Sequence, residues 1–98
     1  MYTFKSIVLI FAIAVSTVTN LEAASTEERA ALVDIYNSTG GKYWDDNTNW
    51  LNGDPCTNEW QDVQCTNGNI TELILYDNNL NGTIPTTIDH LVNLVNLV

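Results

Sequence analysis

Ile70, Leu73 and Leu75 are spaced as a short β-strand requires, and this pattern predicts a strand between Ile70 and Tyr76. Leu73 and Leu75 fall on one face of that strand, and Ile74 and Tyr76 fall on the other. The next apolar residues recur every three or four positions, which predicts an irregular or loosely helical return path directed at the same interior. These residues are Leu80, Ile84, Ile88 and Leu91.

An earlier segment, beginning near residue 25, predicts an amphipathic helix. Ser25 and Glu28 have the S-x-x-E spacing of a capping box, and the pair Gly40-Gly41 ends the helix. Its apolar face is predicted to consist of Leu32, Val33, Ile35 and Tyr36. The pattern therefore gives a helix, then an irregular stretch, then a strand and its return path.

Three residues of the return path have special backbone properties. The side-chain amide of Asn78 can satisfy backbone groups where the chain bends and strand pairing stops. Gly82 suits a backbone that turns or passes close to a neighbour, and Pro85 fixes φ and blocks further regular pairing. Written out from Ile70, the segment is I-x-x-L-x-L-x-x-N-x-L-x-G-x-I-P-x-x-I-x-x-L-x-N, and Leu94 begins the same spacing again.

The segment resembles the leucine-rich repeat of the plant-type class, because it matches that repeat at nearly every signature position. The segment before it resembles the N-terminal cap of that class, in the order Trp44, Asn49-Trp50-Leu51, Asp54-Pro55-Cys56 and Trp60-x-x-Val63-x-Cys65. An ordinary leucine-rich hairpin or αβ segment is the alternative. The resemblance implies an α/β fold: a right-handed leucine-rich-repeat solenoid whose disulfide-stapled cap covers the first coil. The resemblance places the cap at 25–68, the first repeat at 69–93 and the truncated start of a second at 94–98, and the residues before the cap predict a signal peptide at 1–24.

One position departs from the family pattern, because Asp62 stands where a glycine is usual. If this site requires a positive φ, aspartate is among the better non-glycine residues for it. The resemblance also implies a disulfide between Cys56 and Cys65, which closes a loop of about ten residues and stabilises the fold by about 2 to 3 kcal/mol. A zinc site is the alternative, but two cysteines and the distant His90 do not supply four ligands.

The first residues predict export. Lys5 precedes an unbroken apolar run from Ile7 to Val15, and small residues at Ala23 and Ala24 offer a cleavage site. An uncleaved anchor is the alternative, although the run is much shorter than a membrane-spanning helix. Export would make three sequons usable for glycosylation, at Asn37, Asn69 and Asn81. The expected location is extracellular, or the cell surface if a membrane segment lies downstream.

The formal net charge is −9, and it stays the same without residues 1–24 because Lys5 and Glu22 leave together. Such an acidic chain is not expected to bind nucleic acid or anionic membranes, which require clusters of Lys and Arg. No membrane-spanning segment is expected in the mature chain.

Catalytic and metal-binding patterns are weak. Asp45, Asn47 and Asn49 begin like a calcium loop, but Trp50 and Cys56 replace its glycine and glutamate. No nucleotide-binding, zinc-protease or nucleophile motif is present. We therefore expect no catalysis, no cofactor and no metal in this chain. Trp44, Trp50 and Trp60 fit the core of the cap better than a carbohydrate platform.

The resemblance implies that residues between the buried strand positions line a concave binding face: Thr71, Glu72, Ile74, Tyr76 and Asp77. The expected function is recognition of a protein or peptide, as the N-terminal part of a receptor-like or secreted leucine-rich-repeat protein. Two alternatives are the ectodomain of a receptor kinase and a secreted enzyme inhibitor. The apolar segment from Leu94 to Val98 predicts an open edge. Because of this edge, we expect the chain on its own to be poorly folded or to self-associate.

Overall fold

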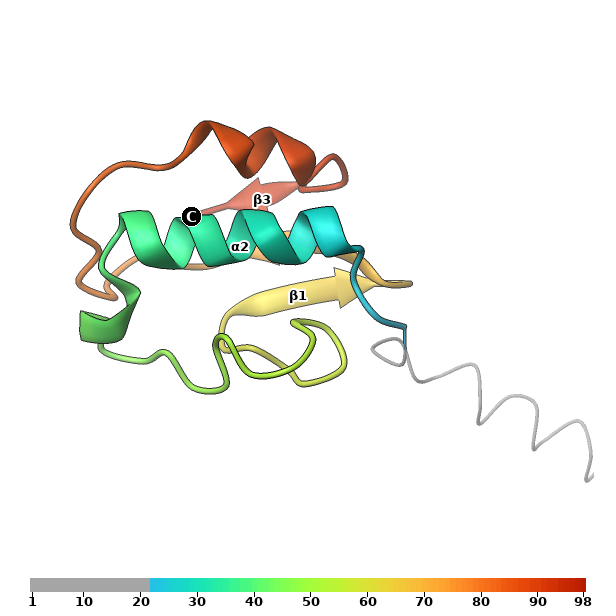
Figure 1. Ribbon diagram of the computed structural model, residues 1–98, viewed down its shortest axis with the longest axis horizontal. Helices are drawn as coiled ribbons and strands as arrows, with labels where there is room; N and C mark the ends of the chain where they lie inside the picture. Colours follow the sequence, from blue (N-terminus) through green and yellow to red (C-terminus); the bar gives the residue numbers. More distant parts are fainter. Residues whose placement is uncertain (1–21) are drawn as a thin grey trace, which may run out of the picture.

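A computed structural model describes residues 22–98 of this protein (Figure 1). Apart from its last three residues, the predicted signal peptide lies outside the described residues. The elements in chain order are helix α2 (Thr26–Ser38), 3-10 helix η1 (Gly41–Tyr43), strands β1 (Val63–Thr66) and β2 (Asn69–Leu73), 3-10 helix η2 (Thr86–His90) and strand β3 (Asn96–Leu97).

Helix α2 begins and ends where the sequence predicts. The Ser25 hydroxyl accepts a hydrogen bond from the Glu28 N–H at 3.1 Å, and the Glu28 carboxylate accepts from the Ser25 N–H at 3.4 Å, so the capping box is complete. The helix ends before Gly40, which has a left-handed φ of 70°. A Cβ at the next residue, Gly41, would collide with the Tyr36 ring, so only glycine lets the chain turn there.

The three strands form one mixed sheet in the order β1-β2-β3. Strands β1 and β2 form an antiparallel hairpin whose two-residue turn, Asn67-Gly68, has positive φ at both positions, as a type I′ turn requires. Strand β1 is an element that the apolar pattern did not predict. It is short, and its pairing includes a bulge between Gln64 and Cys65.

Strand β3 lies parallel to β2, with Glu72 opposite Asn96 and Leu73 opposite Leu97. The chain therefore comes back beside itself after 24 residues, counted from 72 to 96. The sequence spacing has the same period, since Ile70 and Leu73 correspond to Leu94 and Leu97. Between the two strands the chain runs through η2, which contacts α2 (Figure 1).

The core lies between α2 and one face of the sheet. The largest fully buried side chains are Trp60, Leu32, Ile35, Ile70, Leu73, Thr39, Pro55 and Cys56. Leu75 and Leu91 are buried with them, and Leu80 and Ile88 pack against the same cluster. Ile84 was predicted to face the interior, but it is 44% exposed, because none of the described residues covers that side of the return path.

The irregular stretch between η1 and β1 is held by aromatic packing and by a disulfide between Cys56 and Cys65. Trp50 contacts both Trp44 and Trp60, with ring centroids 4.9 and 5.2 Å apart. All three tryptophans are at most 5% exposed, and each indole N–H donates to a backbone carbonyl. They are therefore core residues and offer no exposed platform for a sugar.

Long-range hydrogen bonds join this stretch to the helix and the sheet. Arg29 on α2 donates to the carbonyls of Gly53 and Leu51, at 2.9 and 3.1 Å, and its guanidinium lies 5.1 Å from the centre of the Trp60 ring. Asp54 accepts from the N–H of Ala24 at 2.9 Å. The segment predicted as a cap and the segment predicted as a repeat therefore share one core, and the predicted boundary at residue 68 falls in the turn of the β1–β2 hairpin.

Candidate binding surface

The face of the sheet that points away from α2 is the surface on which the predicted binding residues can be tested. Cross-strand register places Gln64, Glu72 and Asn96 side by side on it, and backbone hydrogen bonds continue the pairing past the strand ends. We call these three residues, together with Ile74, Tyr76 and Val98 just beyond the strands, the outer sheet face. Their chain neighbours Cys65, Leu73 and Leu75 are buried in the core. Buried and exposed residues alternate along β1, whereas in β2 the buried Ile70 and Leu73 are separated by two half-buried residues.

Three of the five predicted residues, Glu72, Ile74 and Tyr76, lie together on the outer sheet face. Thr71 does not join them fully, because its hydroxyl donates to the Gln64 carbonyl at 3.3 Å. Asp77 follows the strand in a left-handed conformation, with φ at 60°, and lies exposed beside Tyr76. The predicted binding residues thus comprise three on the outer sheet face, with Thr71 before them and Asp77 after them in the chain.

A polar hollow of about 240 Å³ adjoins the outer sheet face next to Ile74. Its lining consists of Glu59, Trp60, Gln61, Asp62, Val63, Gln64 and Ile74. The Asp62 carbonyl accepts a hydrogen bond from the Ile74 N–H at 3.1 Å, which holds this loop against the end of β2. The sequence pattern missed Glu59, Asp62 and Gln64 as site residues, and the hairpin signal Asn67-Gly68 would have placed them beside β2.

Asp62 has a φ of 66°, so the position does adopt the left-handed conformation considered from the sequence. Aspartate tolerates this region better than most residues. The backbone there turns without glycine, and the aspartate adds a carboxylate to the rim of the polar hollow.

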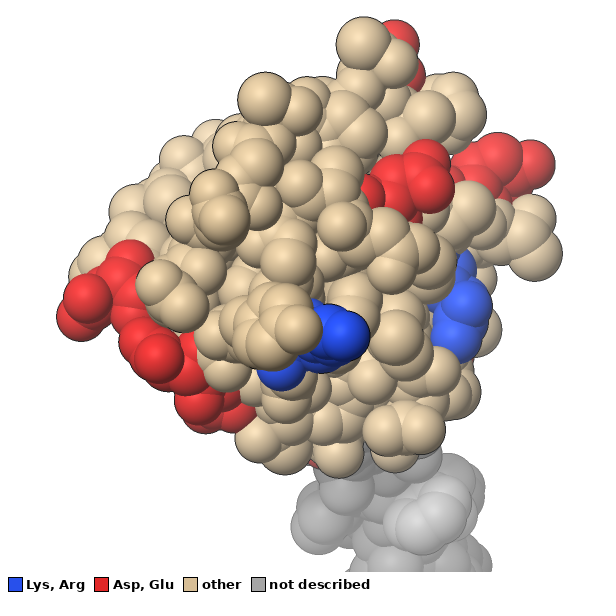
Figure 2. Space-filling view, turned by 60° about the vertical axis from the view of Figure 1, so that its left-hand side comes forward, with Lys and Arg blue, Asp and Glu red and all other residues tan. Residues whose placement is uncertain are grey.

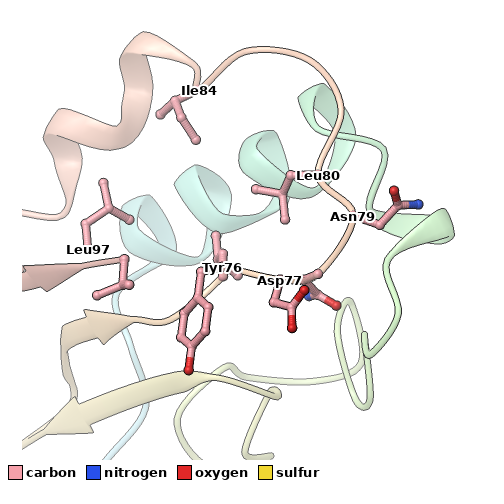
Figure 3. Close-up of a pocket in the computed structure, with 9 residues that line it drawn as sticks. Tyr76, Asp77, Asn79, Leu80, Ile84 and Leu97 are labelled. Atoms are coloured by element: carbon pink, nitrogen blue, oxygen red, sulfur yellow. The ribbon is translucent and has the colours of Figure 1, made fainter.

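A second hollow, of about 540 Å³, lies where the sheet and return path end (Figure 3). The side chains of Leu80, Ile84 and Leu97 surround it, whereas Tyr76 and Asp77 point away from them. Leu75 and Val98 complete its apolar lining. We call these five apolar residues, Leu75, Leu80, Ile84, Leu97 and Val98, the open end. Strand β3 is an edge strand beside it, so the expected exposed apolar edge is present.

The bend after β2 is fastened to the loop that follows η1. The buried Asn78 side chain accepts from the Asp46 N–H at 2.8 Å and donates to the Asp46 carbonyl at 3.2 Å. This is the backbone-satisfying role predicted for Asn78. In the same loop, hydrogen bonds from the Thr48 hydroxyl and the Thr48 N–H lower the pKa of the Asp46 carboxyl below its ordinary value.

Charge is unevenly distributed over the described residues. They contain two basic side chains, Arg29 and Lys42, against twelve acidic ones. In Figure 2 acidic groups gather in separate clusters at two sides of the molecule, and the basic groups lie apart from each other. Neither Arg29 nor Lys42 lines the polar hollow or the open end.

The three sequon asparagines, Asn37, Asn69 and Asn81, are all exposed. None of them belongs to the outer sheet face. The Asn37 and Asn81 sequons are neighbours, because the Asn81 N–H donates to the Thr39 carbonyl at 3.0 Å.

No group of three His, Cys, Asp or Glu side chains within residues 22–98 is arranged to hold a metal ion. None of the helices in this range is long and apolar enough to cross a membrane. Searches against protein-family models, curated proteins and solved structures found no match for this chain. The expectation that the chain lacks catalysis stays a prediction.

Proposed function

We propose that this chain forms the cap and first coil of an extracellular leucine-rich-repeat recognition module, which binds a protein or peptide through the outer sheet face. The observation that carries the proposal is the parallel pairing of β2 with β3 at the period of the sequence repeat. In a solenoid of this kind each strand pairs in parallel with the equivalent strand of the next repeat.

Details of the turn support the same assignment. Asn78 satisfies backbone groups at the bend, and Gly82 passes so close to the Ser38 carbonyl that no side chain fits. Both residues stand at signature positions of the repeat. The positive φ at Asp62, where the family pattern has glycine, fits the proposed cap.

The surface chemistry supports recognition. Tyr76 is 67% exposed and offers a rigid ring with a polar end, and Ile74 beside it is half-buried. Residues of this kind contribute much of the energy of protein interfaces. The disulfide is compatible with an extracellular location.

The proposal can be tested with short random peptides displayed on phage and selected against the disulfide-intact chain. Binders are then compared on Tyr76→Ala and on a matched control, Tyr43→Ala. The two tyrosines are equally exposed, at 67% and 68%, but Tyr43 lies outside the outer sheet face. We expect Tyr76→Ala to weaken binding by about tenfold and Tyr43→Ala to leave it unchanged.

Equal losses from both tyrosine variants would argue against the outer sheet face as the binding site. Binders whose affinity is insensitive to Tyr76→Ala, and to Ile74→Ala as well, would also overturn the proposal. Thermal melts of each variant show whether a loss of binding reflects a loss of folding.

A further inference from the structure

Within the part of the chain that the structure describes, the carboxylates around the outer sheet face have no basic partner. Within residues 22–98 one ion pair is present, the exposed contact between Asp89 and His90 at 3.8 Å. Arg29 is engaged by backbone carbonyls and by the Trp60 ring, and Lys42 lies over the Tyr43 ring at 5.0 Å. The acidic groups that border the outer sheet face are therefore neutralised by neither cation.

These acidic groups lie on two sides of Ile74 and Tyr76, the apolar side chains of the outer sheet face. Glu59 and Asp62 line the polar hollow next to Ile74, and Asp77 lies at the other end beside Tyr76. Glu72 stands in the sheet between Gln64 and Asn96. A ligand that covered Ile74 and Tyr76 would thus bring its flanking groups within reach of carboxylates at both ends.

From this arrangement we infer that the partner of the outer sheet face is a protein segment that carries Lys or Arg side chains beside apolar ones. The inference rests on the proposed function, because it names the partner class of the same surface. Apolar side chains of the segment contact Ile74 and Tyr76, and its cations lie over Asp62, Glu72 and Asp77. Complementary charge speeds association and selects against acidic partners, for which like charges would be opposed.

The experiment uses two synthetic peptides of equal length, one alternating Lys with Val and the other alternating Glu with Val. Binding to the disulfide-intact chain is measured by isothermal titration at low and moderate salt. We expect the Lys-Val peptide to bind at least tenfold more tightly than the Glu-Val peptide, and we expect this preference to shrink as salt rises.

Two double variants separate local from overall charge. Asp62→Asn with Glu72→Gln removes two carboxylates of this surface, and asparagine tolerates the positive φ at position 62. Glu27→Gln with Asp89→Asn makes the same change in net charge on α2 and η2, which lie across the sheet. We expect the first pair to weaken binding of the Lys-Val peptide about tenfold, and the second pair less than twofold.

Equal effects of the two double variants would overturn the inference, since attraction would then be a property of the overall charge. Equal binding of both peptides would overturn it too. If Tyr76→Ala weakens phage-selected peptides while the Asp62 and Glu72 variant does not, the basic partner class is wrong and the proposed function stands. If neither variant affects any bound peptide, the proposed function fails and the inference fails with it.

Discussion

Glu28 is a carboxylate that is only 4% exposed, and it performs two tasks at once. One oxygen closes the capping box with Ser25, and the other accepts a hydrogen bond from the Ile70 N–H at 3.1 Å. The same side chain therefore starts the helix and fixes the beginning of β2. A buried N–H without this partner would bear the full cost of leaving water.

We predict that Glu28→Ala lowers the free energy of unfolding by about 2 to 3 kcal/mol, because the helix loses its capping box and the Ile70 N–H loses its acceptor. Glu28→Gln keeps one acceptor oxygen and should cost about 1 kcal/mol. Urea denaturation of the disulfide-intact chain measures both changes.

The control for this prediction is Glu27→Ala, which removes an exposed carboxylate from the same helical turn. The loss expected there is below about 1 kcal/mol. The assigned role of Glu28 would be refuted by a Glu28→Ala loss no larger than that of Glu27→Ala.

At the scale of elements, the contact between the return path and the end of α2 depends on Gly82. Its φ is 125°, and an added Cβ would collide with the Ser38 carbonyl oxygen. The backbone of the return path therefore packs directly against the helix C-terminus. This close approach lets the Asn81 N–H reach the Thr39 carbonyl.

For Gly82→Ala we predict a loss of at least about 3 kcal/mol of stability, since both the backbone conformation and the contact with Ser38 forbid a side chain. Gly53→Ala is a matched control. Gly53 also has a positive φ, 62°, but its added Cβ would make ordinary contacts with Asn58.

The control should cost about 1 to 2 kcal/mol, the penalty of a left-handed conformation alone. Chemical denaturation of the two variants gives the difference. Equal losses would show that the approach of Gly82 to Ser38 contributes nothing.

The elements with local signals could be predicted from the sequence. The capping box and the Gly40-Gly41 pair defined α2, and the spacing from Ile70 to Tyr76 predicted β2, although the strand ends earlier, at Leu73. Strand β1 was missed because its four residues have no apolar period beyond Val63 and Cys65, and its position depends on pairing with β2. The Asn67-Gly68 turn was the local signal for that pairing.

The same difference in range explains the candidate site. Glu72, Ile74 and Tyr76 lie within five consecutive residues, at the end of β2 and just after it, so their local spacing was enough to group them. The β1–β2 hairpin brings Asp62 and Gln64 to this surface, and the parallel pairing of β2 with β3 brings Val98. No local sequence pattern brings these distant positions together. The prediction that Ile84 is buried was wrong, because a side chain on the return path is buried only where other residues pack over it.

At the scale of the whole molecule, the uncharged segment from Leu91 to Val98 ends in an edge strand. Val92 and Val95 are 79% and 84% exposed, and Leu97 and Val98 are about half exposed. Unpaired apolar edges of this kind promote association between chains. In a molecule that is elsewhere strongly acidic, this edge is the surface on which copies would meet with least repulsion.

We therefore predict that the chain self-associates in a concentration-dependent manner, as measured by sedimentation velocity. Val95→Lys should suppress the association, because a charge at the exposed residue that precedes the edge strand β3 opposes pairing. Thr57→Lys is the control, with the same change in charge at an exposed position far from β3 in the fold. A wild-type chain that sediments as a monomer at every concentration would contradict the prediction.

The hydrogen bond between Glu28 and Ile70 also has a consequence in time. The two residues are 42 positions apart, so during synthesis the helical segment leaves the ribosome well before its carboxylate can find the strand. Contacts across so long a stretch of chain form more slowly than local ones, because the intervening loop must first be closed. A short helix without its tertiary partners is marginal in water. Helix α2 therefore gains this contact only after residue 70 has been made, and the N-terminal segment is completed by a strand that is made later.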